Sequence, residues 1–254
     1  MILYFSATGN SKYVAKKIAE ARGDEIYSII DIMESGDFTI DLRHESSVGI
    51  ISPTYAWGLP SIVADFLRKV KLVYETKPYM YFIATYGATP GNAGFFANKY
   101  LKEKNSVEID AYYSVKMPDT WTPMFDLSDS KKVAAVNKKA EKEIDGIIVK
   151  ISNQAVSKHM KREAPAVTAL VYKPYYNNMR KTKHFTVEDS CIGCELCKQK
   201  CLIRAIEMKN GKPVWIREQC VMCLGCLHRC PKFSIQYGRK TKKHGQYLNP
   251  HVKI

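Results

Sequence analysis

The chain has 254 residues, of which 46% are hydrophobic, and a formal net charge of +14 at pH 7. That length suffices for one or two domains with a sizeable core. No run approaches the 18 consecutive apolar residues of a membrane-spanning helix, so no membrane span is expected. Met1 leads straight into an apolar run without a charged leader, so we expect no signal peptide and a cytoplasmic protein.

The positive charge lies entirely in the second part of the chain. Residues 1–150 hold 19 basic and 19 acidic residues, whereas residues 151–254 hold 20 basic and 6 acidic ones. Such an excess is either a solvated basic surface or an attraction for an acidic partner. No helix-turn-helix or RNA-binding motif accompanies it, so an acidic protein partner is expected rather than nucleic acid.

The first part alternates short apolar strands with amphipathic helices. The helices are expected after residue 11, around 62–70, over 93–102 and over 130–158. Alternation of this kind predicts an α/β fold with an open, doubly wound, five-stranded parallel sheet. Ligands of such sheets bind beyond the carboxyl ends of the strands, where the strand order reverses. The five strands are predicted at 1–5, 26–30, 48–52, 79–86 and 107–115.

Three loops are expected at that edge of the sheet. Loop 6–11 follows a strand and opens a helix, so its N–H groups and hydroxyls suit a phosphate, although simple helix capping by Asn10 or Ser11 is an alternative. Loop 53–60 offers two aromatic side chains, which either stack on a planar ring or belong to the core. Loop 86–92 has glycines that allow a close approach of the backbone. Together the loops favour a planar ring with a phosphate tail.

Over about residues 1–155 the chain resembles the flavodoxin family, which implies FMN as a cofactor. Ser11 stands where the family's phosphate loop more often has Thr, which keeps the hydroxyl. Gly58 would be the hinge beside flavin N5, and Tyr55 or Trp57 would stack on the ring. Trp121 is a weaker candidate, for which packing is an equal alternative. The resemblance implies FMN contacts at Ser6, Thr8, Gly9, Asn10, Ser11, Thr54, Tyr55, Ala56, Trp57, Gly58, Thr85, Tyr86, Gly87, Gly91 and Asn92.

All eight cysteines lie in two motifs that share one spacing and are offset by 29 residues. The flanking apolar residues repeat with the same offset, which indicates an internal duplication. A disulfide framework needs an oxidising compartment, and structural zinc uses well-separated pairs of cysteines. Iron–sulfur ligation accounts for all eight thiols. The motifs comprise Cys191, Cys194, Cys197 and Cys201, then Cys220, Cys223, Cys226 and Cys230.

Over about residues 184–238 the chain resembles two-cluster bacterial-type ferredoxins, which implies a small α+β domain with two [4Fe–4S] clusters. Leu202 replaces a usual Pro, so a looser turn is expected there, whereas Pro231 fits the family. His228 is expected at the surface or beside a cluster, because four thiolates already complete each cube. By this resemblance one cluster takes Cys191, Cys194, Cys197 and Cys230, and the other takes Cys220, Cys223, Cys226 and Cys201.

These resemblances divide the chain into four predicted parts. In the linker, Pro165, Pro174 and the asparagines at 177–178 are expected to break regular structure, and the tail is expected to be partly mobile. Residues 209–212 read as a hairpin turn. The parts are a flavodoxin-like FMN-binding domain (1–158), a linker (159–184), a two-cluster ferredoxin domain (185–238) and a basic C-terminal tail (239–254).

We therefore interpret the chain as an iron–sulfur flavoprotein that passes electrons between FMN, two [4Fe–4S] clusters and a redox partner protein. The resemblance implies the metabolism of an anaerobe. A flavin-dependent reductase of a small molecule and a cluster-based redox sensor are the alternatives. No GxGxxG follows a strand, so a nicotinamide would have to reach the flavin directly. Turnover with NAD(P)H would separate the enzyme from the carrier.

Overall fold

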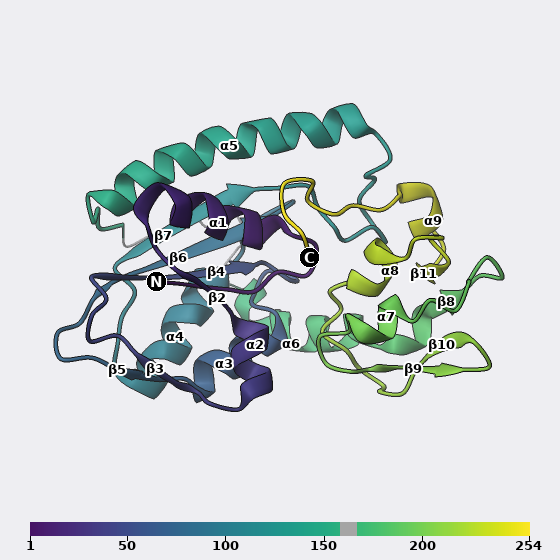
Figure 1. Cartoon of the computed structure of the whole chain (residues 1–254), viewed down its shortest axis with the longest axis horizontal. Helices are drawn as coiled ribbons and strands as arrows, with labels where there is room; N and C mark the ends of the chain where they lie inside the picture. Colours follow the sequence, from purple (N-terminus) through teal and green to yellow (C-terminus); the bar gives the residue numbers. More distant parts are fainter. Residues whose placement is uncertain (158–166) are drawn as a thin grey trace.

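The computed structural model describes residues 1–157 and 167–254. Figure 1 shows a larger half, with a central sheet between helices, beside a smaller half that contains the cysteine motifs. Among the described residues, no helix combines the length and the apolar character needed to cross a membrane.

A five-stranded parallel sheet forms the centre of the larger half, as the alternating pattern predicts. The strand order is β2-β1-β4-β6-β7, and every neighbouring pair is parallel. The order reverses between β1 and β4, which is where doubly wound sheets bind ligands. The strands are β1 (Ile2–Tyr4), β2 (Ile26–Ser28), β4 (Ser47–Pro53), β6 (Tyr79–Tyr86) and β7 (Ala111–Lys116).

Helices cover both faces of the sheet, because successive residues of each strand point to opposite sides. Helices α1 and α5 bury one face, where Ile51 and Ile83 lie, and helices α3 and α4 bury the other, where Ile50 and Phe82 lie. The four helices are α1 (Asn10–Arg22), α3 (Ser61–Lys69), α4 (Ala93–Asn105) and α5 (Ser130–Ser152).

Three expectations for this half need correction. The second strand ends at Ser28, whose hydroxyl accepts from the Asp31 N–H and so caps α2 (Ile29–Ser35). Two short strands that the sequence did not indicate, β3 (Thr39–Asp41) and β5 (Lys71–Val73), pair with each other in parallel. Helix α5 ends at Ser152, and residue 158, its expected end, lies outside the described residues.

The expected break at Pro174 and the two asparagines is wrong, because helix α6 (Thr168–Met179) runs through all three. Tyr172 and Tyr176, one turn apart on this helix, are 4% and 3% exposed. The Tyr172 hydroxyl donates to the Leu59 carbonyl, and the Tyr176 hydroxyl donates to the Val221 carbonyl at 2.6 Å. Burial of these rings outweighs the helical hydrogen bond that a proline removes. Pro165 lies outside the described residues.

The smaller half confirms the duplication that the sequence indicates. Strand β8, before the first motif, pairs antiparallel with β11, after the second motif. Strand β9, after the first motif, pairs antiparallel with β10, before the second motif. Asn210 and Gly211 have φ of 51° and 74° and make the predicted hairpin turn between Lys209 and Lys212. The elements are η1 (Thr182–His184), β8 (Phe185–Val187), α7 (Leu196–Gln199), β9 (Ile206–Lys209), β10 (Lys212–Trp215), α8 (Gly225–Arg229) and β11 (Ile235–Tyr237).

The C-terminal segment is packed, and the expectation of a mobile tail is wrong. After helix α9 (Thr241–His244) the chain returns to the larger half, as the yellow trace in Figure 1 shows. Tyr247 and Asn249 are 6% and 2% exposed. The Asn249 N–H donates to the Thr8 carbonyl at 2.8 Å. The composition of the tail does not indicate this contact, because the tail packs on a loop at the other end of the chain.

Candidate functional site

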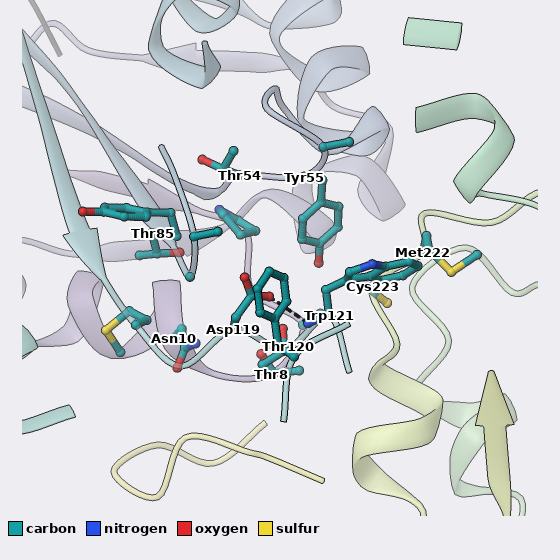
Figure 2. Close-up of a pocket in the computed structure, with 18 of the residues that line it drawn as sticks. Thr8, Asn10, Thr54, Tyr55, Thr85, Asp119, Thr120, Trp121, Met222 and Cys223 are labelled. Carbon is teal, nitrogen blue, oxygen red and sulfur yellow. Dashed lines mark hydrogen bonds between the residues drawn. The ribbon is translucent and has the colours of Figure 1, made fainter. Parts of the chain in front are cut away.

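A cavity of about 230 Å³ lies where the loops at the carboxyl ends of the strands face the cysteine-rich half. Its wall includes Thr8 and Tyr55 from the larger half and Met222 and Cys223 from the smaller half. In Figure 2, Tyr55 and Trp121 lie between these sulfur-bearing residues on one side and the first loop on the other. The cavity therefore brings together residues from both predicted domains.

The first loop, residues 6–11, has a fixed shape. Gly9 has a φ of 102°, and a Cβ there would lie 2.6 Å from the Cβ of Asn249, so only glycine fits. The hydroxyls of Ser6 and Ser11 already have partners: the Gly9 N–H at 3.1 Å and the Thr85 hydroxyl at 2.8 Å. No side chain of the described residues caps α1. An anion held here would therefore rely on the backbone N–H groups that begin this helix and on the hydroxyl of Thr8, which lines the cavity.

The second loop is a tight turn around two aromatic residues. Tyr55 and Gly58 exchange two backbone hydrogen bonds of 2.9 Å, and Ala56 and Trp57 between them have φ of 48° and 69°. A bulky residue with positive φ stores strain, which is commonly found at functional sites. Trp57 packs on Tyr175 with ring centroids 5.1 Å apart. Tyr55 and Trp57 both line the cavity, so either ring borders whatever binds there.

The third loop leaves space at Gly87 for the carboxyl group of Asp119, which lines the cavity. A Cβ on Gly87 would lie 2.1 Å from the Cβ of Asp119, so a larger residue would displace this aspartate. Asp119 Oδ1 accepts from the Trp121 N–H at 2.9 Å, which is the dashed line in Figure 2. Burial raises the pKa of Asp119, against the lowering effect of the N–H groups of Trp121 and Ala88.

Four of the predicted contact residues lie outside the cavity lining and position their neighbours instead. Gly58 packs under the Tyr172 ring, where a Cβ would come within 2.6 Å. The Asn92 N–H donates to the Trp57 carbonyl at 2.7 Å, and a Cβ on Gly91 would lie 2.5 Å from the same oxygen. Gly9 shapes the first loop. The remaining predicted residues are lining residues: Ser6, Thr8, Asn10, Ser11, Thr54, Tyr55, Ala56, Trp57, Thr85, Tyr86 and Gly87.

Several lining residues were not anticipated. Asp119 and Thr120 follow β7, and the rule that ligands bind beyond strand ends could have identified them. Trp121, the weaker candidate of the sequence analysis, lines the cavity beside them. Met222 and Cys223 reach the cavity only because the two halves dock, which no local pattern in the sequence indicates.

The eight cysteines, which the ferredoxin resemblance assigns to two crossed sets, are free thiols. Cys191, Cys194, Cys197 and Cys230 together line a small pocket. These four thiols therefore surround a common space. Burial raises the pKa of Cys220 to about 12, and Cys223 and then Cys201 add to that rise. The effect of Cys201 indicates that it lies near the second motif.

Backbone N–H groups point at sulfur in both sets. The Ala205 N–H donates to Cys201 Sγ at 3.2 Å, and the Ser234 N–H, 29 residues further on, donates to Cys230 Sγ at 3.3 Å. Such bonds stabilise thiolates and thereby suit a cluster held by sulfur ligands.

His228 joins the two halves and is not a surface residue. It is 3% exposed, and its Nε2 donates to the Thr120 carbonyl at 2.9 Å while its Nδ1 accepts from the Tyr247 N–H at 3.2 Å. Burial lowers the pKa of His228 to about 4, which fits a neutral ring with one donor and one acceptor.

The flavodoxin domain family matches residues 1–145, which is more than half of the chain. The chain belongs to this flavodoxin-domain family. Residues 190–235 of the chain match the 4Fe-4S dicluster domain family. The α/β half and the cysteine-rich half thus carry the two domain types of an electron-transferring redox flavoprotein.

Individual relatives cover only parts of this flavodoxin-domain protein. A polyferredoxin-like protein of Methanocaldococcus jannaschii is 40% identical over 62 residues, which are 19% of this chain and 37% of that relative. The chain thus spans little more than a third of the relative's length.

Two solved structures resemble the flavodoxin-domain half at low identity. A flavoprotein from Bacteroides uniformis is 18% identical, with a TM-score of 0.36, over 47% of this chain and 90% of its own. A Fusobacterium nucleatum flavodoxin bound to flavin mononucleotide is 10% identical, with a TM-score of 0.36, over 60% of this chain and 96% of its own.

Proposed function

We propose that this protein transfers electrons between FMN, two [4Fe–4S] clusters and a partner protein. One observation carries the proposal: Cys223, a predicted cluster ligand, lines the same cavity as Thr8, Tyr55 and Trp121. A flavin in this cavity and a cluster on the second motif would be immediate neighbours. Bound FMN would exchange one or two electrons, and each cluster would exchange one.

The residues of the cavity suit FMN. Backbone N–H groups from the 6–11 loop would bind the phosphate, because an unsatisfied helix N-terminus favours an anion. Tyr55, Trp57 and Trp121 would border the ring system. The Asp119 carboxyl also lines the cavity, with its pKa raised by burial and its Oδ1 bonded to the Trp121 N–H.

The two crossed sets of thiols suit two clusters. Each set has four sulfur donors, and each receives at least one backbone N–H on sulfur. The two sets differ in their access to solvent. Cys220 is buried next to the flavin cavity, whereas Cys194 is exposed and Ile192 beside it is 59% exposed. A partner would therefore exchange electrons at the set that contains Cys194.

We propose that this partner is acidic. The tail lysines lie near the exposed set, since Lys242 pairs with Glu188, three residues before Cys191, at 2.9 Å. Electron transfer from an acidic ferredoxin should slow as salt rises, because salt screens exposed charges within about 8 Å at physiological ionic strength. Charge reversal at Lys240 and Lys243 should lower the rate, and reversal at two exposed lysines of α5, Lys139 and Lys142, should not. Equal effects of both pairs would contradict docking at the tail.

Cofactor analysis and a reductive titration test the function together. Anaerobically purified protein should contain about eight irons, eight inorganic sulfides and one FMN per chain. Full reduction should then take up about four electrons per chain, two for the flavin and one for each cluster. Tightly bound zinc, or no flavin after reconstitution, would contradict the proposal.

A further inference from the structure

Arg229, the last residue of α8, is a buried cation between the two halves. Its side chain is 8% exposed, and Nη2 donates to the Ala7 carbonyl in the first loop at 2.5 Å. Its other two nitrogens, Nε and Nη1, are buried without a hydrogen-bond partner among the described residues. A buried charge is costly unless an anion or an acceptor faces it. An acceptor is therefore expected beside these two nitrogens.

The free side of the guanidinium faces the second cysteine set. A Cβ placed on Gly225 would lie 2.5 Å from Arg229 Nη1 and 3.5 Å from Cys223 Sγ, so both atoms border one point. Burial lowers the pKa of Arg229, and the neighbouring Cys223, Cys226 and Tyr55 act against that lowering. The guanidinium thus lies between the flavin loop and the thiols nearest the cavity.

The duplication shows that this arrangement belongs to one set only. The 29-residue offset pairs Arg229 with Lys200 and Gly225 with Leu196. Lys200 is exposed, and the first motif has Leu196 where the second has Gly225. The exposed set therefore has a solvated cation where the buried set has a desolvated one.

We propose that Arg229 donates hydrogen bonds from Nε and Nη1 to sulfur of the cluster on Cys201, Cys220, Cys223 and Cys226, and raises its reduction potential above that of the other cluster. Reduction adds one electron and one negative charge to a cluster, so a fixed cation beside it favours the reduced form. Hydrogen bonds to sulfur and net charge both set the potentials of such clusters. The inference rests on the proposed function.

Redox titrations followed by EPR test this role in the intact, reconstituted protein. In Arg229→Gln, the reduction equilibrium of the higher-potential cluster should fall by about tenfold, which is about 59 mV for one electron, and the other cluster should stay unchanged. Gly225→Ala keeps the charge but puts a methyl group 2.5 Å from Nη1, so it should shift the same cluster in the same direction. Lys200→Gln is the matched control and should leave the higher potential unchanged.

The outcomes separate this role from a structural one. If Arg229→Gln weakens FMN binding or stability but both cluster potentials stay in place, Arg229 only holds the Ala7 loop and the inference is wrong. Equal shifts of both clusters would also overturn it. If Arg229→Gln does not take up its clusters, the redox titration of Gly225→Ala alone tests the inference. A parent protein without two clusters would instead refute the proposed function.

Discussion

The Tyr247 hydroxyl donates to Asn10 Oδ1 at 3.0 Å, although 237 residues separate the two along the chain. The same oxygen accepts from Asn249 Nδ2 at 3.3 Å, and the Asn249 N–H holds the Thr8 carbonyl. Asn10 in turn donates from Nδ2 to the Pro118 carbonyl at 3.1 Å. The shape of the predicted phosphate loop therefore depends on the C-terminal segment.

Tyr247→Phe should weaken FMN binding without changing the fold. It removes a hydroxyl whose single hydrogen is shared by Asn10 Oδ1 at 3.0 Å and Asn137 Oδ1 at 3.2 Å. A neutral hydrogen bond is typically worth about 1 kcal/mol, so the dissociation constant should rise about fivefold. Quenching of FMN fluorescence on titration with the flavin-free protein measures this dissociation constant. Tyr27→Phe, which removes only an exposed bond to Glu25, is the control and should bind FMN like the parent. Unchanged affinity in Tyr247→Phe would show that the loop holds its shape alone.

Thr8→Val tests the phosphate site itself. Thr8 is 5% exposed and lines the cavity, and valine keeps its shape while removing the hydroxyl. A lost hydrogen bond to a charged group is typically worth about 1.5–3 kcal/mol, so FMN affinity should fall about tenfold to a hundredfold. Riboflavin lacks the phosphate, so its binding should change little.

Thr54→Val is the matched control for that experiment. Thr54 lines the same cavity, but its hydroxyl donates to the Pro90 carbonyl at 3.1 Å. Its loss should affect FMN and riboflavin alike. If Thr8→Val also weakened both ligands equally, the phosphate would have to bind elsewhere.

The crossed thiol sets predict which cluster each substitution destroys. Cys201→Ala should release Cys220, Cys223 and Cys226, because these thiols lie with Cys201. Cys230→Ala should do the reverse, because Cys230 lines the pocket of the first three cysteines. Anaerobic alkylation followed by peptide mass mapping identifies the released thiols in each variant. Release of the three cysteines nearest in sequence would contradict the crossed arrangement.

Asp119→Asn should make stability less dependent on pH. Burial raises the pKa of Asp119 above its ordinary 3.8, so between the two values the folded state binds the extra proton. As pH rises through that window the parent loses stability, by about 1.4 kcal/mol for each unit of raised pKa, and asparagine does not. The thermal midpoint of the variant should therefore gain on the parent as pH rises from 3.8, and the difference should become constant once pH passes the raised pKa. A difference that stays constant with pH would contradict a raised pKa.

Local patterns predicted the sheet, its helices and the three loops at its carboxyl edge, because hydrophobic periodicity and turn residues depend on neighbours in the sequence. They failed where distant packing decides. Pro174 is accommodated because Tyr172 and Tyr176 bury their rings and bond to the larger and the smaller half, respectively. The basic tail is ordered by its bonds to the 6–11 loop. The predicted domain boundaries remain predictions.

The candidate site shows the same division. The motifs identified the thiols and most of the cavity lining contributed by the larger half. Cys223 in the cavity wall, His228 against Thr120 and Arg229 against Ala7 all depend on docking of the two halves. Nothing in the local sequence indicates that the two halves dock, since these side chains would lie at the surface of an isolated domain.

The most direct test of the account is the kinetics of electron transfer within one chain. A flash that delivers one electron to the flavin should be followed by bleaching of cluster absorbance. Because Cys223 lines the flavin cavity, this step should be first order, with a rate constant that does not change with protein concentration. A rate that rises in proportion to protein concentration would mean that electrons pass between molecules, and would contradict a shared flavin and cluster site.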